Sequence, residues 1–325
     1  MAKIAVIIVN YNAADLVLEG IRSVLDRQPD GHDVHIHLID NASPAQDGPR
    51  LARAIAENGW QDQVTLRAEQ ENHGFGRGNN LALQALAGVA DRPDFVFLLN
   101  PDAHLKPDTL AVLADFMDSH PRAAMLGTRA FNPDTPEPVT AAFRFPGICS
   151  TFAAALNFGP VARLLAHHQV SLGGRLSTQP VDWVSGAAVL ARFEVWEDLG
   201  FFDPAYFLYY EEVDLMLRTQ RAGWECWHVA EAEIVHVEGA STDVKGAHNG
   251  PRRRPAYWYH SWQYYFRTNY GRAYALGVAA AWITGAALNH VLARMRGQTP
   301  AAPERFFRDF GGHALRPLLG LAPKS

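Results

Sequence analysis

Short apolar runs alternate with helix-spaced apolar residues through the first 130 positions of the chain. The runs predict strands, and the stretches between them, with apolar residues three or four apart, predict helices. Strands that alternate with helices are typical of an α/β domain, in which helices flank a mainly parallel central sheet. In such a sheet, ligands bind beyond the carboxyl ends of the strands. The expected strands are 4–9, 34–39, 64–66, 95–99 and 123–126, and the expected helices are 16–25, 51–57, 81–89 and 107–120.

The pattern changes after residue 131, where four prolines interrupt the chain before residue 147. Residues 140–180 show no clear period, so no element is predicted there. Regular patterns return afterwards, with Gly200 and Gly223 as helix stops. They predict strands over 181–191, 224–229 and 234–237 and helices over 193–199 and 211–221.

Composition places the chain among globular proteins. Its 325 residues, 48% of them hydrophobic, can bury at least one full core and form at most two ordinary domains. The two cysteines, Cys149 and Cys226, form no CxxC pair, which argues against a disulfide framework or a thiolate zinc site and fits a reducing cytosol. Residues 4–9 are shorter than the apolar region of a signal peptide and predict a buried strand instead.

Charge is divided unevenly along the chain. Residues 251–325 hold 11 Lys and Arg against two acids, a net charge of +9, whereas residues 1–250 carry −14. In this basic part, seven aromatic residues between 257 and 266 precede an apolar run over 274–288, which is shorter than the roughly 20 residues of a spanning helix. Extending the run to Leu292 would make a weak span. The pattern predicts a helical extension at an anionic membrane surface; the alternative is a helix packed on the rest of the chain with a solvated basic face.

Polar residues follow the second and third predicted strands. Asp40 ends the second strand, where a carboxylate can accept a hydrogen bond from the imide N–H of uracil or thymine; the alternative is a turn or helix cap. The third strand leads to residues 72–80, with glycines at three alternate positions. Backbone N–H groups there could approach a phosphate or ribose, unless the segment is a turn without a ligand. It is not a dinucleotide fingerprint, because that motif follows the first strand.

The fourth strand ends at Asn100-Pro101-Asp102. Polar side chains directly after a buried strand are costly to desolvate unless they bind something, and a hard cation with diphosphate oxygens would satisfy Asn100 and Asp102. A capping role is less favoured because a separate helix start follows at 106–108. His236 lies in an apolar strand and is expected to be a metal ligand only if it meets Asp102; otherwise it is a core or surface residue.

Three carboxylates, Glu211, Glu212 and Asp214, lie within four residues beside large apolar side chains. Repulsion between neighbouring carboxylates in a partly apolar setting raises one pKa toward neutrality, which suits a general base. The alternative is a solvated, acid-rich first helical turn stabilised by the helix dipole.

These motifs, in this order, resemble the family 2 inverting glycosyltransferases with the A-type fold and, within them, the rhamnosyltransferase-like branch. The resemblance covers most of the chain up to Thr242. It implies a catalytic domain over 1–245, with a Rossmann-like nucleotide-sugar half over 1–130 and an acceptor and catalytic half over 131–245, followed by a basic aromatic helical extension over 246–325. The segments that carry it are 9–12, 40–43, 72–80, 99–102, 183–187, 200–203, 210–215 and 236–241.

The resemblance implies a role for each matching residue. Asp102 and His236 would hold Mn²⁺ or Mg²⁺, with Asn100 in place of the first acid of the usual DxD motif. Glu212 would be the catalytic base, in place of the aspartate of the usual Glu-Asp-x-Asp, supported by Glu211 and Asp214. The nucleotide sugar would bind Asn10, Tyr11, Asn12, Asp40, Asn72, Gly74, Phe75, Gly78, Asn80, Asn100 and Asp102. The acceptor would bind Trp183, Ser185, Gly186 and Tyr210, core packing being the alternative for the aromatic residues.

The implied activity is inverting transfer of one sugar from a nucleoside diphosphate to an acceptor hydroxyl. Rhamnose from dTDP-rhamnose is the favoured donor, with UDP-sugars open. The expected acceptor is a glycan or lipid-linked glycan of the cell envelope or an exopolysaccharide, and nucleic acid is not an expected partner. The expected location is cytoplasmic, peripheral at the inner face of the cytoplasmic membrane.

Two other functions share features with this sequence. A nonenzymatic nucleotide-sugar-binding or envelope scaffold protein is favoured by the departures at Glu212 and Asn100. A sugar-nucleotide pyrophosphorylase would need a basic glycine loop after the first strand, and the sequence has none there.

Overall fold

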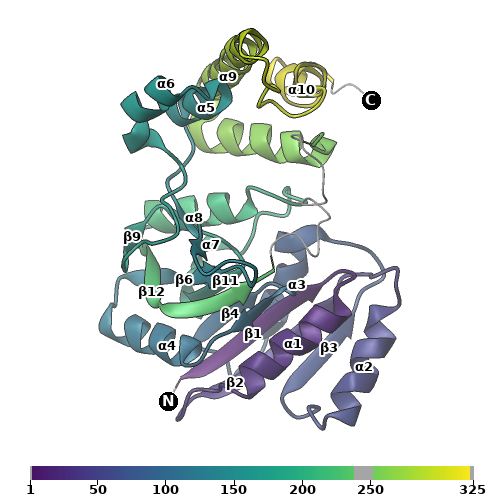
Figure 1. The fold of residues 1–325 in the computed structure, drawn as a ribbon. Coiled ribbons are helices and arrows are strands. Elements are labelled where there is room, and N and C mark those ends of the chain that lie inside the picture. The colour runs from purple at the N-terminus through teal and green to yellow at the C-terminus, as the bar shows by residue number, and fades with distance from the viewer. Residues whose placement is uncertain (1, 238–251, 323–325) are drawn as a thin grey trace. The chain divides into compact units, whose positions relative to one another are not determined.

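The computed structural model describes residues 2–237 and 252–322, which form two compact units (Figure 1). The first unit comprises residues 1–143, 172–207 and 211–243, and the second comprises 144–171, 208–210 and 244–325, apart from the residues not described. The predicted division differs from this one, because residues 144–171 and 208–210 group with the C-terminal helices. The predicted boundary at residue 245 lies outside the described residues.

A ten-stranded sheet forms the centre of the first unit, in the order β3-β2-β1-β4-β11-β6-β12-β5, with β7 beside β6 and β9 beside β12. The β3-β2-β1-β4 part is parallel and has the strand order of a Rossmann half. β11 is antiparallel to both its neighbours, so the rest of the sheet is mixed. The strands are β1 (Lys3–Asn10), β2 (Asp33–Asp40), β3 (Val64–Ala68), β4 (Phe95–Leu99), β5 (Ala103–Leu105), β6 (Ala123–Phe131), β7 (Pro138–Val139), β9 (Gln179–Val181), β11 (Ala188–Arg192) and β12 (Glu225–His236).

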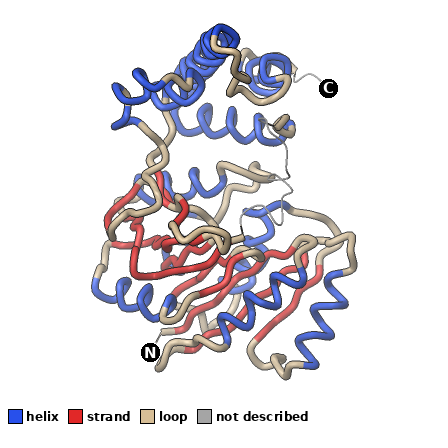
Figure 2. The backbone as a smooth tube through the Cα atoms, in the orientation of Figure 1, coloured by secondary structure: helices blue, strands red, loops and turns tan. Residues whose placement is uncertain are grey.

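Helices cover both faces of this sheet (Figure 2). Alternate residues of a strand point to opposite faces, and β1 is apolar on both. Ile4, Val6 and Ile8 pack with residues of α1, α2 and α4, whereas Ile7 and Val9 pack with residues of α3, α7 and α8. The helices are α1 (Ala14–Leu25), α2 (Asp47–Glu57), α3 (Gly74–Ala87), α4 (Thr109–Ser119), α7 (Phe193–Leu199) and α8 (Glu211–Arg221). The predicted α/β class is confirmed.

Four predicted elements differ from the structure. The helix expected at 81–89 begins at Gly74, so the glycine-rich segment is the first turn of α3 and not a loop. The strand expected over 181–191 is divided into β9, β11 and β10 (Trp183–Val184), which pairs with β8 (Ala142–Phe143) in a small second sheet. The two closing strands are one strand, β12, whose register shifts between Val229 and Glu233.

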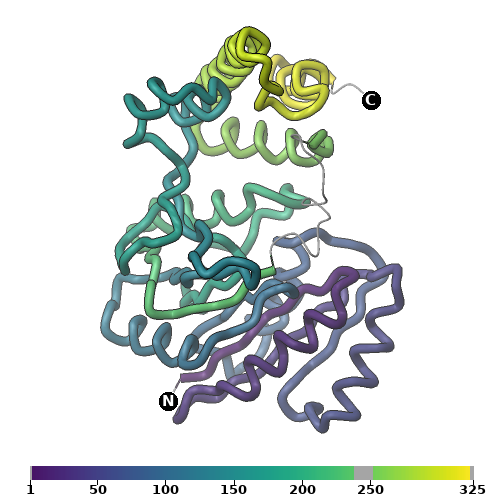
Figure 3. The backbone as a smooth tube through the Cα atoms, in the orientation of Figure 1, coloured from purple at the N-terminus to yellow at the C-terminus, as the bar shows by residue number. Residues whose placement is uncertain are grey.

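The second unit is helical. Its helix α5 (Ile148–Leu156) packs against α9 (Ala256–Met295), more than 100 residues away in the chain (Figure 3). Gly285 makes this packing close, since an added Cβ would lie 2.9 Å from the Cβ of Ala155. The other elements are α6 (Gly159–Leu164), η1 (Ala166–His168), α10 (Phe306–Phe310), η2 (Gly311–Leu315) and α11 (Arg316–Leu318). No element was expected over 140–180, because the apolar residues of α5 have no polar face to reveal a period.

Among the described helices, α9 alone is long and apolar enough to cross a membrane. A core helix of a soluble protein can pass the same test. Gly271, at φ +82°, divides α9 into two helical pieces, and 39% of its most apolar stretch is buried within the protein.

Candidate active site

Asn10 joins the carboxyl ends of β1 and β2. Its side-chain amide donates to Asp40 Oδ1 at 2.9 Å, to Asp47 Oδ2 at 3.0 Å and to Ser43 Oγ at 3.1 Å, while its own oxygen accepts from the backbone N–H of Ala13. The side chain is fully buried. We call Asn10, Asp40, Ser43 and Asp47 the β1–β2 cluster. Because every polar atom of Asn10 is used within the protein, this residue holds the two strand ends together.

Asp40 keeps one oxygen for another partner. Its Oδ1 also accepts from the Ser43 hydroxyl, whereas its Oδ2 makes no hydrogen bond within the described part of the chain. Gly48 lies against this second oxygen, since an added Cβ would be 2.9 Å from it. Asp40 is therefore a held carboxylate with one free acceptor atom at a strand end, the place where this type of sheet binds ligands.

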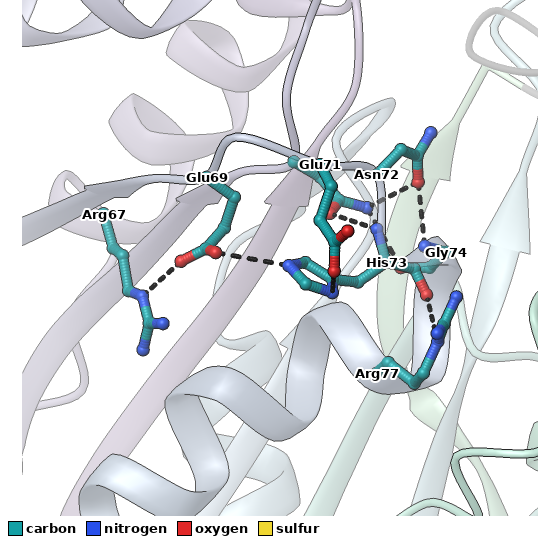
Figure 4. A network of polar contacts seen from close by, with 8 residues as sticks. Arg67, Glu69, Glu71, Asn72, His73, Gly74 and Arg77 are labelled. Carbon is teal, nitrogen blue, oxygen red and sulfur yellow. Dashed lines mark hydrogen bonds and ion pairs between the residues drawn. The ribbon is translucent and has the colours of Figure 1, made fainter.

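The start of α3 is held by side chains around Asn72 (Figure 4). Asn72 Oδ1 accepts from the N–H of Gly74 at 2.8 Å and from the Asn41 amide at 3.1 Å, and Asn41 Oδ1 accepts from the N–H of His73. Gly74 has φ +75°, and an added Cβ would lie 1.8 Å from the carbonyl oxygen of Phe207. Glycine is thus required here by backbone contact as well as by conformation.

Arg77 is a cation that the sequence reasoning missed, although it lies within the glycine-rich segment. It occupies the first turn of α3, and its Nε donates to the carbonyl of His73 at 2.8 Å (Figure 4). A positive charge in the first turn of a helix adds to the partial positive charge of the helix terminus. This end of the sheet is therefore suited to an anionic ligand.

The remaining residues predicted to bind the nucleotide sugar have different surroundings. Asn80 is buried and bonds both amide atoms to the backbone of Phe202, at 2.8 and 3.1 Å, and the ring of Phe75 packs edge-on against that of Phe202. Both therefore hold the turn before α8. Tyr11 and Asn12 are exposed after β1. Gly78 packs against Val9, with an added Cβ only 2.9 Å from a methyl group.

Asp102 and His236 are in contact, which is the condition under which the sequence predicts His236 to be a metal ligand. The antiparallel pairing of β5 with β12 sets Ala103 opposite His236, which brings Asp102 Oδ1 to 3.1 Å from His236 Nε2. Asp102 is 3% exposed. Within the described residues no group of three or more His, Cys, Asp or Glu side chains could hold a metal. The pair supplies one oxygen and one nitrogen, and donors of these two kinds suit a divalent cation. Residues 238–241 of the same motif lie outside the described residues.

Glu212 is positioned by the segment before β11. Its Oε1 accepts from the N–H of Gly186 at 2.8 Å, and an added Cβ at Gly186 would be only 2.0 Å from this oxygen. The next residue, Ala187, accepts at its carbonyl from the N–H of Asn100 at 2.9 Å. Burial raises the pKa of Glu212 to about 7, and the Gly186 hydrogen bond opposes the shift. Glu212 is thus linked through two backbone contacts to the strand end that carries Asp102.

Glu211 and Asp214 contrast with Glu212. Glu211 is buried, its Oε2 has no partner among the described residues, and burial together with the charge of Glu212 raises its pKa well above the usual value. Asp214 is also buried but is paired with Arg218 at 2.8 Å. Arg218 in turn donates to the carbonyls of Leu199 and Phe201. Asp214 therefore braces the turn after α7, whereas burial raises the pKa of both glutamates.

The residues predicted to bind the acceptor belong to both units of the chain. Ser185 and Gly186 lie beside Glu212 in the first unit, through the Gly186 hydrogen bond. Trp183 stacks on Phe143, with ring centroids 4.1 Å apart. Tyr210 belongs to the second unit, where its ring contacts those of Trp258 and Tyr265.

Comparisons with known proteins point to one family. The model of Glycosyl transferase family 2 matches residues 5–165, and that of Glycosyl transferase family group 2 matches residues 95–302. The chain is 32% identical over 209 residues to N-acetylglucosaminyl-diphospho-decaprenol L-rhamnosyltransferase of Mycobacterium tuberculosis. The aligned region covers 58% of this chain and 67% of that protein. It is 28% identical over 167 residues to Rhamnosyltransferase WbbL of Escherichia coli K12, covering 50% and 61%.

Solved structures show the same fold. Mannosyltransferase PcManGT from Pyrobaculum calidifontis, solved in complex with GDP-Man and Mn²⁺, aligns with a TM-score of 0.51 at 17% identity over 91% of this chain and 80% of that one. At this identity the likeness concerns the fold alone.

Proposed function

The chain belongs to glycosyl transferase family 2 and is rhamnosyltransferase-like, and from that premise we propose that it is an inverting transferase that uses Glu212 as its base. The observation that carries this proposal is the position of Glu212, held by Gly186 beside the strand end of Asn100 and Asp102. A carboxylate with a pKa of about 7 can take a proton at neutral pH.

For the donor we propose a pyrimidine nucleoside diphosphate sugar, with dTDP-rhamnose favoured and UDP-sugars as alternatives. Asp40 Oδ2, which has no partner within the described residues, would accept from the imide N–H of the base. The first turn of α3, with Arg77, would face the diphosphate charge. The rhamnosyltransferase names of both relatives support rhamnose as the sugar.

Asp102 and His236 would hold a divalent ion, Mn²⁺ or Mg²⁺, together with diphosphate oxygens. When bound, such an ion stabilises negative charge on the leaving diphosphate. The Mn²⁺ in the mannosyltransferase complex supports this assignment.

In the reaction, the acceptor hydroxyl loses its proton to Glu212 while its oxygen forms a bond to the anomeric carbon. The bond from that carbon to the diphosphate oxygen breaks, and the nucleoside diphosphate leaves with the electron pair. Attack from the face opposite the leaving group inverts the configuration. Burial and the charge of Glu212 raise the pKa of the neighbouring Glu211, which favours the neutral form of that carboxyl group.

For the acceptor we propose a lipid-linked glycan at the inner face of the cytoplasmic membrane. The name of the mycobacterial relative, which specifies a diphospho-decaprenol acceptor, supports this choice. The second unit also carries most of the exposed large apolar side chains of the described residues, including Leu164 at 76% and Met295 at 80% exposure. Apolar side chains on a basic unit suit an anionic membrane surface.

The test is release of nucleoside diphosphate from dTDP-rhamnose and UDP-sugars with Mn²⁺ or Mg²⁺, in the wild type and in Glu212→Gln. We expect the variant to lose about 10²- to 10⁴-fold in kcat, the usual contribution of a general base. Glu194→Gln, which changes an exposed glutamate in the first turn of α7, is the control and should keep full activity. Donor binding without turnover in the wild type would favour the scaffold alternative.

A further inference from the structure

The second unit contains a cavity of about 260 Å³ that the transfer reaction described above does not use. It lies among α5, the first and second pieces of α9 and the segment before α10. Three tryptophans form its apolar wall, and hydroxyl-bearing residues and one arginine supply its polar groups. These residues are Trp258, Trp262, Trp282, Ser150, Thr151, Tyr210 and Arg254.

Arg254 is the one cation in the cavity wall, and it has no counter-ion among the described residues. Its guanidinium carbon lies 3.8 Å from the centroid of the Trp258 ring and 5.4 Å from that of Trp282. Its neighbour Arg253 makes two hydrogen bonds to Asp309, at 2.6 and 3.0 Å. Arg254 is half-buried. A guanidinium that is partly removed from water without a carboxylate partner is costly unless a ligand supplies the negative charge.

Tyr210 brings a hydroxyl to the same wall. Tyr209 and Tyr210 both have left-handed backbone conformations, at φ +69° and +70°, which are unfavourable for bulky residues and tend to occur at functional sites. Burial raises the pKa of Tyr210, so its hydroxyl stays neutral and can donate a hydrogen bond. In the chain, Tyr210 is followed directly by Glu211.

A planar guanidinium and neutral hydroxyl donors suit a phosphate group, and indole faces suit an apolar chain. The volume is below the roughly 300–1,000 Å³ of pockets that enclose a whole small ligand, so the cavity would take one part of a larger molecule. An apolar chain that leaves the cavity would find further apolar surface on the same unit, where α9 exposes Leu288 and Val291.

We propose that this cavity binds the junction between phosphate and polyprenyl chain in a lipid-linked acceptor, with Arg254 on the phosphate and the tryptophans on the first isoprene units. This inference rests on the proposed function, because it identifies the occupant as the acceptor of the transfer reaction. It adds a site in the second unit that selects acceptors by their lipid carrier and not by their sugar.

The test measures binding of farnesyl diphosphate to the full chain by tryptophan fluorescence and thermal shift, without a donor. We expect saturable binding, with farnesol and inorganic diphosphate each at least about tenfold weaker, because each lacks one half of the recognised group. Arg254→Gln should weaken binding by roughly 10- to 100-fold, the effect of losing one charge-assisted hydrogen-bonding partner, and Arg254→Lys by less.

Two further variants separate the site from general effects. Arg267→Gln removes another guanidinium of α9, which lies 5.8 Å from the centroid of the Tyr264 ring but outside the cavity. This variant should bind farnesyl diphosphate as the wild type does. Ala154→Phe adds bulk at an exposed position of the cavity wall, where folding should tolerate it, and should also weaken binding.

The outcomes distinguish this proposal from the proposed function. Equal binding by the wild type and Arg254→Gln, in a protein that releases nucleoside diphosphate, would overturn the cavity proposal and leave the function standing. Arg254-dependent binding in a protein without turnover would support the cavity proposal and overturn the proposed function. If short-chain phosphatidylglycerol competes as well as farnesyl diphosphate, the occupant is a membrane phospholipid and the acceptor assignment is wrong.

Discussion

Two groups of acidic side chains in the first unit differ in how far their hydrogen bonds are satisfied. In the β1–β2 cluster, Asn10 and Ser43 bond to one oxygen of Asp40 and leave its other oxygen open to a ligand, and Asn10 also bonds to Asp47. At the start of α8, one oxygen of Glu211 has no partner among the described residues, and Glu212 is held by a backbone N–H. Satisfied buried groups stabilise a fold, whereas unsatisfied ones reduce its stability and persist where they serve a reaction.

The same contrast exists within α8, and Asp214→Asn gives the largest expected effect on stability. Because Asp214 is buried and paired with Arg218, its loss leaves an uncompensated charge, so we expect a loss of about 3 to 5 kcal/mol in the free energy of unfolding. Urea unfolding measures this loss, and Asp198→Asn, at an exposed site, should change it little. Glu212→Gln should unfold like the wild type; if it is destabilised as strongly as Asp214→Asn, the contrast between the two carboxylates is wrong.

In the β1–β2 cluster, Asn10→Ala should act on the fold and only secondarily on the reaction. It leaves Asp40 and Asp47 without their shared donor, and we expect a loss of about 2 to 3 kcal/mol in the free energy of unfolding. The affinity for the donor nucleotide, measured by thermal shift with dTDP, should fall much less than in Asp40→Asn. Equal losses of affinity in the two variants would place Asn10 in contact with the ligand.

The sequence predicted the place of both groups but not their difference. The strand-end positions of Asp40 and Asp102 follow from apolar periodicity, which fixes where strands stop. The contact of Asp102 with His236 depends on the pairing of β5 with β12, two strands 120 residues apart. Periodicity carries no information about such pairing, so the contact could only be expected from family resemblance.

Hydrogen-bond partners were the least predictable part. Asn80 matches a family motif, yet the structure uses its amide to hold the backbone of Phe202. Asp214 also matches a family motif, yet its charge is neutralised by Arg218. Helical spacing alone would have suggested this i,i+4 ion pair. The sequence also could not show that residues 144–171 group with the C-terminal helices. The small residues of α5 pack closely on Gly285, and such a contact leaves no periodic signal in the sequence.

Gly186→Ala tests whether the position of Glu212 matters as much as its charge. A Cβ at 2.0 Å from Glu212 Oε1 would displace the carboxylate, with a cost in stability of about 1 to 3 kcal/mol. We expect kcat to fall by roughly tenfold or more, because small displacements of a catalytic group are costly. Gly159→Ala, where an added Cβ meets nothing within 4 Å, should change neither quantity. Full activity in Gly186→Ala would mean that Glu212 need not be held by this segment.

A change of pH acts on activity and stability in opposite directions. The proposed base, Glu212, must be charged to accept a proton. Because its pKa is raised to about 7, kcat should fall about tenfold for each pH unit below 7 and level off above it. For stability, the raised pKa means that the folded state binds the Glu212 proton more tightly than the unfolded state does. The stabilising contribution is therefore complete below the unfolded pKa of 4.5 and is lost as pH rises through about 7.

Glu211, whose pKa is also raised, adds to the stability effect in the same sense. Profiles of kcat and of the free energy of unfolding between about pH 5.5 and 8.5 measure both trends. In Glu212→Gln the pH dependence of stability should become shallower, because one of the two titrating carboxyl groups is gone. A wild-type kcat that stays constant through pH 7 would assign the proton transfer to another group, and the raised pKa values of Glu211 and Glu212 would then be a consequence of their burial alone.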